Sequence, residues 1–188
     1  MILPIYGYGH PVLKKKAVEI TPDYPDLATL IENMWETMYN AEGVGLAAPQ
    51  VGLSIRLFLV DTTRWTKADE EGDEAKGIKK VFINARKVEE TGELWPFEEG
   101  CLSIPDIRGD VERPERITLH YFDENFIERQ ETFSGLDARV IQHEYDHIEG
   151  RLFTELLNPL KRKLIKGKLE RIRKGLVKVD YPMRFATR

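Results

Sequence analysis

The chain has 188 residues, 41% of them hydrophobic, and a formal net charge of −4. This length and apolar content predict a single domain, residues 1–188, with a core of its own. One cysteine excludes an internal disulfide, and no apolar run is long enough to span a bilayer. The first residues lack the charged start and long apolar stretch of a secretory signal peptide, so we expect a cytoplasmic protein with no membrane partner.

The first clear element is a helix predicted near residues 26–39. Six apolar side chains recur on one face of it: Leu27, Leu30, Ile31, Met34, Trp35 and Met38. Gly43 lies just beyond its end, where a glycine commonly follows a helix. A helix with one apolar stripe needs an apolar partner surface, so we expect it to pack against a sheet.

Four strand-like runs follow, at residues 56–61, 81–85, 116–122 and 126–133. Residues 123–125 mark a hairpin turn between the last two runs, and the acidic residues 69–74 are expected to form a solvated connection. The strands do not alternate regularly with helices, which favours an α+β fold over a doubly wound one. We expect antiparallel β-sheets packed around a central metal-binding helix, with an N-terminal helix and a C-terminal helix.

The motif HEYDH at residues 143–147 predicts that central helix and its metal. His143 and His147 are four residues apart, so on a helix they share a face and can bind one metal ion, with Glu144 beside them to transfer protons. Three apolar residues precede them at helical spacing: Leu136, Val140 and Ile141. We therefore expect the histidines to extend a buried stripe; the alternative is a surface helix with a charged face.

A third protein ligand decides the class of hydrolase, because a catalytic metal site keeps three protein ligands and one open position. Phe153 occupies the place of the last histidine in the metzincin pattern, and phenylalanine cannot donate a lone pair. Glu170 lies 170 − 147 = 23 residues after His147, as a gluzincin ligand would. Basic residues surround Glu170, however, so a surface ion pair is the simpler explanation.

The only cysteine, Cys101, is the remaining candidate ligand. His10 precedes a proline in an N-terminal turn and His120 lies in a strand-like run, so both are weaker candidates. Cys101 follows Gly100 and lies shortly before Pro105, in a turn-forming segment where no small core residue is required. A thiolate and two imidazoles would leave the fourth position of a tetrahedron open for water.

Three motifs occur in the order in which the peptide deformylase family carries them: GVGLAAPQ at residues 43–50, EGCLS at 99–103 and QHEYDH at 142–147. The chain resembles that family from about Ile5 to about Lys174. The resemblance implies a metal-dependent hydrolase that removes the formyl group from the N-terminal formyl-methionine of newly made polypeptides and releases formate. Two departures are Tyr145, where the family usually has an aliphatic or methionine side chain, and an apparent insertion at residues 63–79.

The resemblance implies a metal ion and a proton carrier. Cys101, His143 and His147 would hold one divalent ion, with Fe²⁺ as the working metal, although Zn²⁺, Ni²⁺ or Co²⁺ suit the same ligands. Glu144 would take a proton from the water that the metal activates and return it to the departing amine.

Two further roles follow from the resemblance. The side-chain amide of Gln50 and the backbone N–H of Leu102 would stabilise the charge that grows on the carbonyl oxygen. Asp146 and Glu99 are expected to be partners of the ligating histidines, which usually donate their other ring N–H to a carboxylate or carbonyl.

The bound peptide is expected to meet six residues: Gly43, Val44, Gly45, Arg108, Leu136 and Val140. Taken alone, the Gly-x-Gly segment would be a helix end and turn, and it lacks the lysine of a phosphate-binding loop. Beside the other motifs it predicts a wall where a peptide backbone pairs edge-on. Val44, Leu136 and Val140 would shape an apolar pocket for a methionine side chain, and Arg108 resembles a family position near the bound peptide.

A basic C-terminal helix is predicted at about residues 158–175. This segment holds eight basic residues and one acid, 8 − 1 = +7, and four apolar residues that suggest an amphipathic helix: Leu160, Leu164, Leu169 and Ile172. One interpretation is a solvated charged face. The other is docking to the ribosome, because a deformylase acts on nascent chains and a basic helix is attracted to RNA phosphates.

Two other classes of protein compete with this interpretation. A zinc endopeptidase that uses Glu170 would keep its metal after Cys101→Ala and cleave internal peptide bonds. A nucleic-acid-binding module with a structural metal would have no open water position and no hydrolytic activity. Both leave Gln50 and the glycine motif unexplained.

Overall fold

The computed structural model describes residues 1–65 and 76–187. Its α-helices and strands, in chain order, are β1 (Ile5–Tyr6), α1 (Leu27–Asn40), β2 (Gly45–Ala47), β3 (Leu57–Asp61), β4 (Lys79–Cys101), β5 (Ile104–Phe122), β6 (Glu128–Ser134), α2 (Gly135–Ile148), α3 (Pro159–Arg173) and β7 (Met183–Arg184). Strands β2 to β6 form one antiparallel sheet in chain order, and β1 pairs with β7 in parallel. The predicted α+β class is confirmed, whereas the parallel pair was not predicted.

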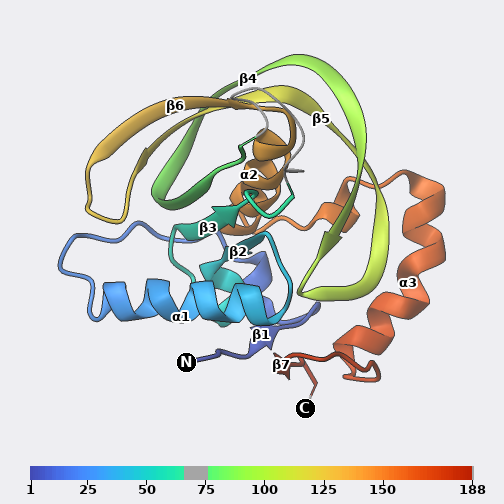
Figure 1. Ribbon diagram of the computed structural model, residues 1–188. Helices are drawn as coiled ribbons and strands as arrows, with labels where there is room; N and C mark the ends of the chain where they lie inside the picture. The colour runs from blue at the N-terminus through green and yellow to red at the C-terminus, as the bar shows by residue number, and fades with distance from the viewer. Residues whose placement is uncertain (66–75, 188) are drawn as a thin grey trace.

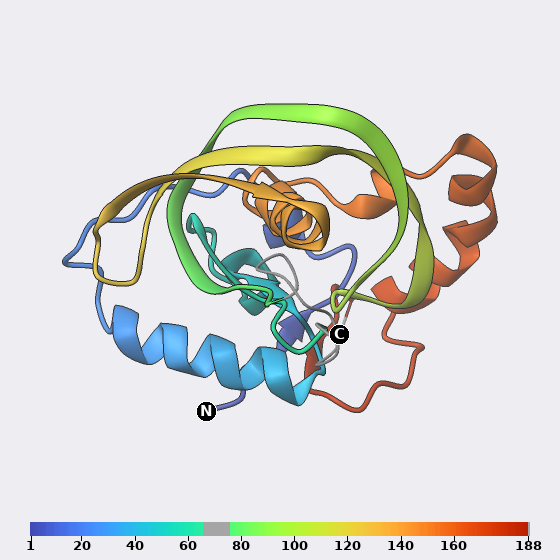
Figure 2. The same ribbon diagram turned by 45° about the horizontal axis from the view of Figure 1, so that its top comes forward.

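Long, bent strands wrap the sheet around α2 (Figure 1). Strands β4 and β5 have 23 and 19 residues and arch over the helix, as the tilted view shows (Figure 2). Register shifts interrupt their pairing at four points, and such bulges bend strands. At the first shift Asn84 adopts a φ of 53°. Its side-chain Oδ1 accepts from the backbone N–H of Ile20 at 2.9 Å, and its Nδ2 donates to the backbone carbonyl of Ile20 at 2.7 Å.

The strand-like runs predicted at residues 81–85 and 116–122 are parts of the much longer β4 and β5. Residues 86–98 of β4 are mostly exposed, so no apolar alternation marks them in the sequence. Between β5 and β6 the predicted turn is confirmed, with Asp123 Oδ1 accepting from the backbone N–H groups of Asn125 and Ile127 at 3.0 Å. Strand β6 starts at Glu128 because Phe126, with a φ of 57°, belongs to the turn.

Helix α2 is the centre of the fold. Ala138, Ile141 and Ile148 are buried in one apolar cluster with Phe58 of β3 and Phe82 of β4. Leu136 is 41% exposed, so the expectation that it extends this buried stripe is wrong. The cluster around α2 begins only at Ala138, and the first turn of the helix lies beyond it.

Helix α1 confirms the helix predicted near residues 26–39, and it packs on the sheet as expected. Ile31, Met34 and Met38 are buried in a second cluster with Leu57 and Leu59 of β3. Strand β2 follows shortly after the end of α1 in the chain, and it lies beside α2.

Helix α3 confirms the predicted C-terminal helix but not its predicted apolar face. Its buried residues recur at intervals of four and three: Ile165, Leu169 and Ile172. Leu160 and Leu164 are 68% and 69% exposed instead. One residue turns a helix by about 100°, so Leu164 and Ile165 point in different directions and only the partner surface decides which is buried.

Some expectations lie outside the described residues. These are the acidic segment at 69–74 and most of the apparent insertion at 63–79. Within residues 1–65 and 76–187, no helix combines the length and apolarity needed to cross a membrane.

Candidate functional site

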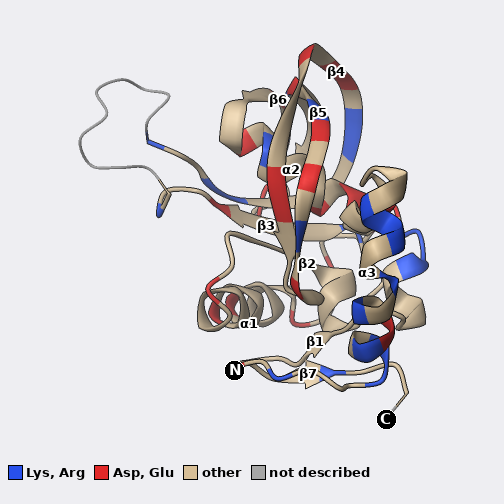
Figure 3. Cartoon of the chain, turned by 90° about the vertical axis from the view of Figure 1, so that its right-hand side faces the viewer, with Lys and Arg blue, Asp and Glu red and all other residues tan. Residues whose placement is uncertain are grey.

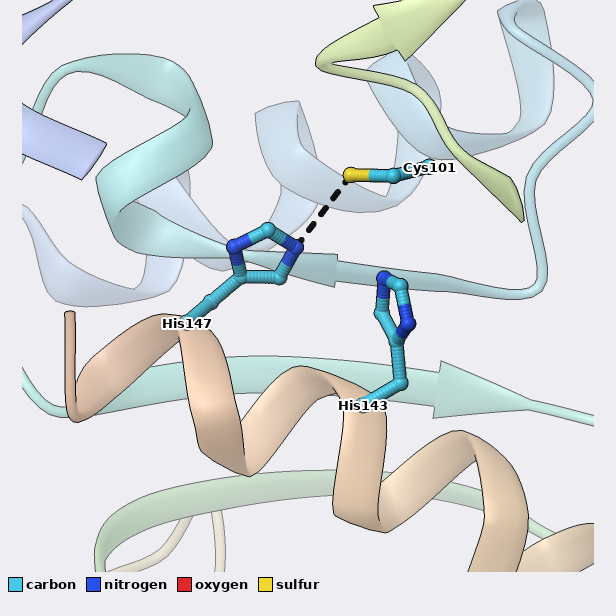
Figure 4. Close-up of side chains that lie close together, drawn as sticks. All are labelled: Cys101, His143 and His147. Carbon is cyan, nitrogen blue, oxygen red and sulfur yellow. Dashed lines mark hydrogen bonds between the residues drawn. The ribbon is translucent and has the colours of Figure 1, made fainter. Parts of the chain in front are cut away.

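Three side chains from two elements converge on one point (Figure 4). Cys101 is the last residue of β4, and His143 and His147 project from successive turns of α2. Their ligand atoms all lie within 4.8 Å of one another, and Cys101 Sγ is 3.4 Å from His147 Nε2. One sulfur and two imidazole nitrogens at this spacing suit a tetrahedral metal site with an open position.

A tight turn brings the cysteine to α2. Cys101 pairs with Ile104 across the antiparallel ladder, which leaves Leu102 and Ser103 as the two connecting residues. We call residues 101–104 the 101–104 turn. The register shift between Gly100 and Cys101 bends β4 just before it, so the predicted turn segment is confirmed.

Glu99 orients the first histidine. Its carboxylate lies 2.9 Å from His143 Nδ1 and accepts from Arg113 Nε at 2.7 Å and Arg139 Nη1 at 3.3 Å. Burial acts to raise the pKa of Glu99, but the hydrogen bonds from His143 and Arg113 lower it to about 2. An ionised carboxylate only accepts, so His143 Nδ1 carries the proton of this hydrogen bond, and Nε2 is the ring nitrogen that a metal would bind. Asp146 Oδ2 instead accepts from Arg113 Nη1 at 2.8 Å, and among the described residues it forms no hydrogen bond with a histidine.

The second histidine and the neighbouring glutamate are both buried. His147 is 1% exposed, and this burial is the main reason that its pKa lies well below the usual value. A neutral imidazole is the form that binds metals. Burial raises the pKa of Glu144 to about 7, and among the described residues Glu144 Oε2 meets no hydrogen-bond partner. This carboxyl can exchange a proton near neutral pH.

Gln50 points its amide nitrogen at the 101–104 turn. Its Oε1 accepts from the backbone N–H of Ala47 at 2.9 Å, which fixes which end of the amide faces the site. Its Nε2 lies 3.5 Å from Cys101 Sγ and 3.2 Å from Ser103 Oγ. A buried, pre-oriented donor therefore stands next to the three candidate ligands.

The site opens into a cavity of about 970 Å³. Most of the predicted site residues line it: Gly43, Val44, Gly45, Gln50, Cys101, Leu102, Arg108, Val140, His143 and Glu144. His147 lies behind this surface, and Leu136 does not belong to the lining. Arg108 is exposed at the rim of the cavity, and its Nη1 lies 3.8 Å from Glu98 Oε1.

The family model described as polypeptide deformylase matches residues 2–163. The chain belongs to the polypeptide deformylase family. The peptide deformylases of Christiangramia forsetii and Flavobacterium johnsoniae are 60% and 58% identical to it, over 98% and 99% of this chain and 96% and 97% of theirs. Deformylases remove N-terminal formyl groups from nascent peptides, and this chain is a hydrolase of that kind.

Solved deformylases share the fold. The crystal structure from Legionella pneumophila gives a TM-score of 0.79 at 36% identity, covering 94% of this chain and 98% of that one. The enzyme from Synechococcus elongatus, solved in complex with actinonin, gives 0.76 at 37% identity, covering 88% and 85%. The likeness to known deformylases therefore extends to both sequence and structure.

The other candidate ligands lie elsewhere in this deformylase. Glu170 forms ion pairs with Arg173 at 2.6 Å and with Lys174, which follows α3, at 3.3 Å, so the surface explanation is confirmed. Phe153 is buried with its ring centroid 5.9 Å from that of His143, and it contributes apolar contact, not a ligand. The remaining histidines, His10 and His120, are not part of the group of three.

The sequence did not reveal the two arginines that contact Glu99, nor did it reveal one wall of the deformylase cavity. Arg139 lies four residues before His143 on α2, a spacing that could have indicated it. Arg113 gave no local signal, because its contact with Glu99 depends on how β4 pairs with β5. The unexpected wall comes from the C-terminal part of the chain: Lys161, Ile165, Lys168, Lys178, Val179, Asp180 and Tyr181.

Proposed function

We propose that this deformylase binds one divalent metal ion through Cys101, His143 and His147 and uses Glu144 as the proton carrier of formyl hydrolysis. The observation that carries the proposal is the convergence of three ligand atoms within 4.8 Å beside a buried carboxyl oxygen that has no hydrogen-bond partner among residues 1–65 and 76–187. When bound, the cation would lower the pKa of a water molecule and polarise the formyl carbonyl. We propose Fe²⁺ as the working metal, with Zn²⁺, Ni²⁺ and Co²⁺ compatible with the same donors.

Glu144 supports proton transfer in both directions. In its ionised form the carboxylate takes a proton from the attacking water, and in its protonated form it donates to the nitrogen of the departing amine. A pKa near 7 makes both forms accessible at neutral pH. Gly45 lies so close to this carboxyl group that it limits where the side chain can go.

Gln50 and the 101–104 turn would stabilise the negative charge on the formyl oxygen. The amide nitrogen of Gln50 is held in place by the contact of its oxygen with Ala47. The backbone N–H of Leu102 is the second donor in this proposal. Donors that are already oriented need no rearrangement as charge develops, which is the main source of their catalytic effect.

The peptide would lie in the cavity with its methionine side chain against Val44 and Val140. Gly43 and Gly45 leave room for its backbone beside β2, and Arg108 stands at the rim. Leu136 remains outside this pocket, because it is exposed and does not line the cavity.

The decisive experiment measures formate release from a formyl-methionyl peptide together with metal content. Glu144→Ala should keep its metal and lose activity by about 10²–10⁴-fold, because general acid–base catalysis is removed. Cys101→Ala should lose both. Glu128→Ala, which removes an exposed acid outside the cavity lining, is the control and should behave like wild type. Activity that survives in Glu144→Ala would refute the proton carrier, and full metal occupancy in Cys101→Ala would refute the ligand.

A second proposal concerns location and partner. We propose that the protein works in the cytoplasm, docked on ribosomes through the basic face of α3. Figure 3 shows Lys and Arg gathered along this helix. Arg162, Lys163 and Lys166 are exposed, and a reducing compartment would protect a thiolate ligand from oxidation.

Neutralising three charges on α3 tests the docking proposal. Arg162→Gln, Lys163→Gln and Lys166→Gln together should weaken binding to ribosomes and reduce its salt dependence, because fewer phosphate contacts form. Removing the whole helix is a poorer test, since Ile165 and Ile172 belong to the core.

A matched triple variant elsewhere on the surface serves as the control. Lys15→Gln, Arg86→Gln and Arg116→Gln remove the same charge from exposed positions outside α3. Equal ribosome affinity of the two triple variants in sedimentation experiments would contradict docking through α3.

A further inference from the structure

Two chain segments that are distant in sequence form hydrogen bonds with the 101–104 turn. The backbone N–H of Tyr8 donates to Ser103 O at 2.8 Å, and the hydroxyl of Tyr181 donates to Leu102 O at 2.8 Å. Tyr181 lies 79 residues after Leu102, in the segment that follows α3. The turn that carries a candidate oxyanion donor is thus held by the C-terminal segment.

The backbone of this segment is anchored independently of Tyr181. Strand β7 pairs in parallel with β1, through hydrogen bonds from Ile5 N to Pro182 O at 2.8 Å and from Gly7 N to Arg184 O at 2.9 Å. The ring of Tyr181 is half-buried against the apolar cluster that includes α1. The backbone that follows Tyr181 and the ring of Tyr181 are therefore held in place without the hydrogen bond from its hydroxyl.

We propose that Tyr181 is a positioning residue, which holds the 101–104 turn so that the Leu102 N–H points at the developing oxyanion. This inference rests on the proposed role of Leu102. The peptide group that carries the Leu102 carbonyl and the one that carries the Leu102 N–H meet at Cα of Leu102. A hydrogen bond that holds the first group therefore narrows the range of orientations open to the second. Gln50 contacts the same turn at Cys101 and Ser103, and the turn is thus fixed from two sides.

The hydrogen bond from Tyr181 to Leu102 would affect catalysis by orienting the Leu102 N–H in advance, although Tyr181 does not touch the reacting atoms of the substrate. An oxyanion donor acts strongly only when it is aligned before the charge develops. Without the hydrogen bond to the Leu102 carbonyl, the turn would sample more orientations. The Leu102 N–H would then have to be brought back into alignment in each turnover. The effect therefore falls on kcat and much less on KM.

Tyr181→Phe tests this proposal because it keeps the ring and removes only the hydroxyl. With formyl-methionyl peptide as substrate we expect kcat to fall about tenfold, the effect of one lost hydrogen bond, while KM stays within about twofold. Metal content should be unchanged, since the Tyr181 hydroxyl donates its hydrogen bond to the carbonyl of Leu102 and not to a candidate ligand. A fall in metal content parallel to kcat would overturn the proposal, because Tyr181 would then act through the metal ligands.

Tyr6→Phe is the matched control. The Tyr6 hydroxyl accepts from Arg184 Nη1 at 2.9 Å, so this variant also removes a tyrosine hydroxyl that ties the same C-terminal segment to the body of the protein. It leaves the 101–104 turn untouched, and its kcat should equal that of wild type. An equal loss of kcat in both variants would mean that general anchoring of the segment matters, and would overturn the specific role of Tyr181.

Gln50→Ala separates this inference from the proposed function. If Gln50→Ala loses kcat and Tyr181→Phe does not, the oxyanion assignment stands and the positioning role is wrong. If neither variant loses kcat, the oxyanion assignment itself fails and the positioning role fails with it. A loss in both variants, with Tyr6→Phe unaffected, is the expected result.

Discussion

Gly45 illustrates how a single residue limits the chemistry of this site. A Cβ atom built on Gly45 would lie 2.8 Å from both Cδ and Cγ of Glu144, closer than real Cβ contacts. The backbone conformation of Gly45 is not left-handed, so the need for glycine here comes from space and not from φ. Strand β2 can pass beside the carboxyl group of Glu144 only without a side chain at this position.

We predict that Gly45→Ala lowers kcat about 100-fold, because the methyl group displaces the Glu144 carboxyl by up to the order of 1 Å. Metal content should stay the same, since the three heavy atoms nearest to the added carbon all belong to Glu144 and not to a candidate ligand. Steady-state kinetics and metal analysis of the purified variant provide the measurement.

Gly167→Ala is the matched control at an open position. A Cβ at Gly167, on α3, meets nothing within 4 Å. Alanine should leave kcat unchanged and stabilise the protein by about 1 kcal/mol through its higher helix propensity. If Gly45→Ala keeps full activity, the placement of Glu144 does not depend on the close approach of β2.

At the scale of elements, an ion pair joins the end of α2 to the start of β3. Glu149, directly after α2, lies 2.8 Å from Arg56 Nη2, and Arg56 is only 5% exposed and also donates to Ala85 O at 2.6 Å. Burial acts to raise the pKa of Glu149, but the contacts with Arg56 and Lys16 lower it below its usual 4.5. The pair therefore helps to hold the metal-binding helix against the sheet.

We predict that Glu149→Gln lowers the free energy of unfolding by about 1 kcal/mol at pH 7, after allowance for partial exposure. A lowered folded-state pKa stabilises the native state above pH 4.5, and this stabilisation is lost as pH falls through the folded-state pKa. The difference between wild type and variant should therefore shrink below pH 4.5. Urea unfolding at several pH values measures both effects.

An exposed pair of the same type is the control. Glu19 and Arg86 are in contact, but their side chains are 46% and 69% exposed, so Glu19→Gln should change stability by less than about 0.5 kcal/mol. A difference between Glu149→Gln and wild type that persists unchanged at pH 3 would contradict ionisation of Glu149 as its source.

For the whole molecule, the candidate metal would connect elements that are far apart in the chain. Cys101 ends β4, and the histidines belong to α2, with β5 and β6 between them. A ligand that binds only the folded state stabilises it in proportion to the logarithm of its concentration over Kd. One domain over residues 1–188 stays a prediction, and cooperative unfolding would support it.

Removal of the metal should consequently lower the unfolding temperature of the entire chain. With metal at 1,000 times its Kd the stabilisation is about 4 kcal/mol, equivalent to roughly 10 °C for a chain of this size. We predict such a decrease when a nickel-loaded preparation is treated with a chelator in scanning calorimetry. The chelator should have no effect on Cys101→Ser, and an equal decrease in that variant would contradict Cys101 as a ligand.

The sequence by itself determined the local chemistry of this protein. The spacing of His143 and His147 requires only the period of a helix, and the turn at Cys101 requires only glycine, proline and short loops, so both were predictable. Helix α1 and the α+β class followed from the same local patterns.

Tertiary structure decided everything that depends on partners distant in the chain. It selected Glu99 and not Asp146 for His143, and it buried Ile165 in place of Leu164. It also brought Tyr181 to the 101–104 turn. Strand register and the packing of α3 and the C-terminal segment create these contacts, and neither is encoded in the spacing of neighbouring residues.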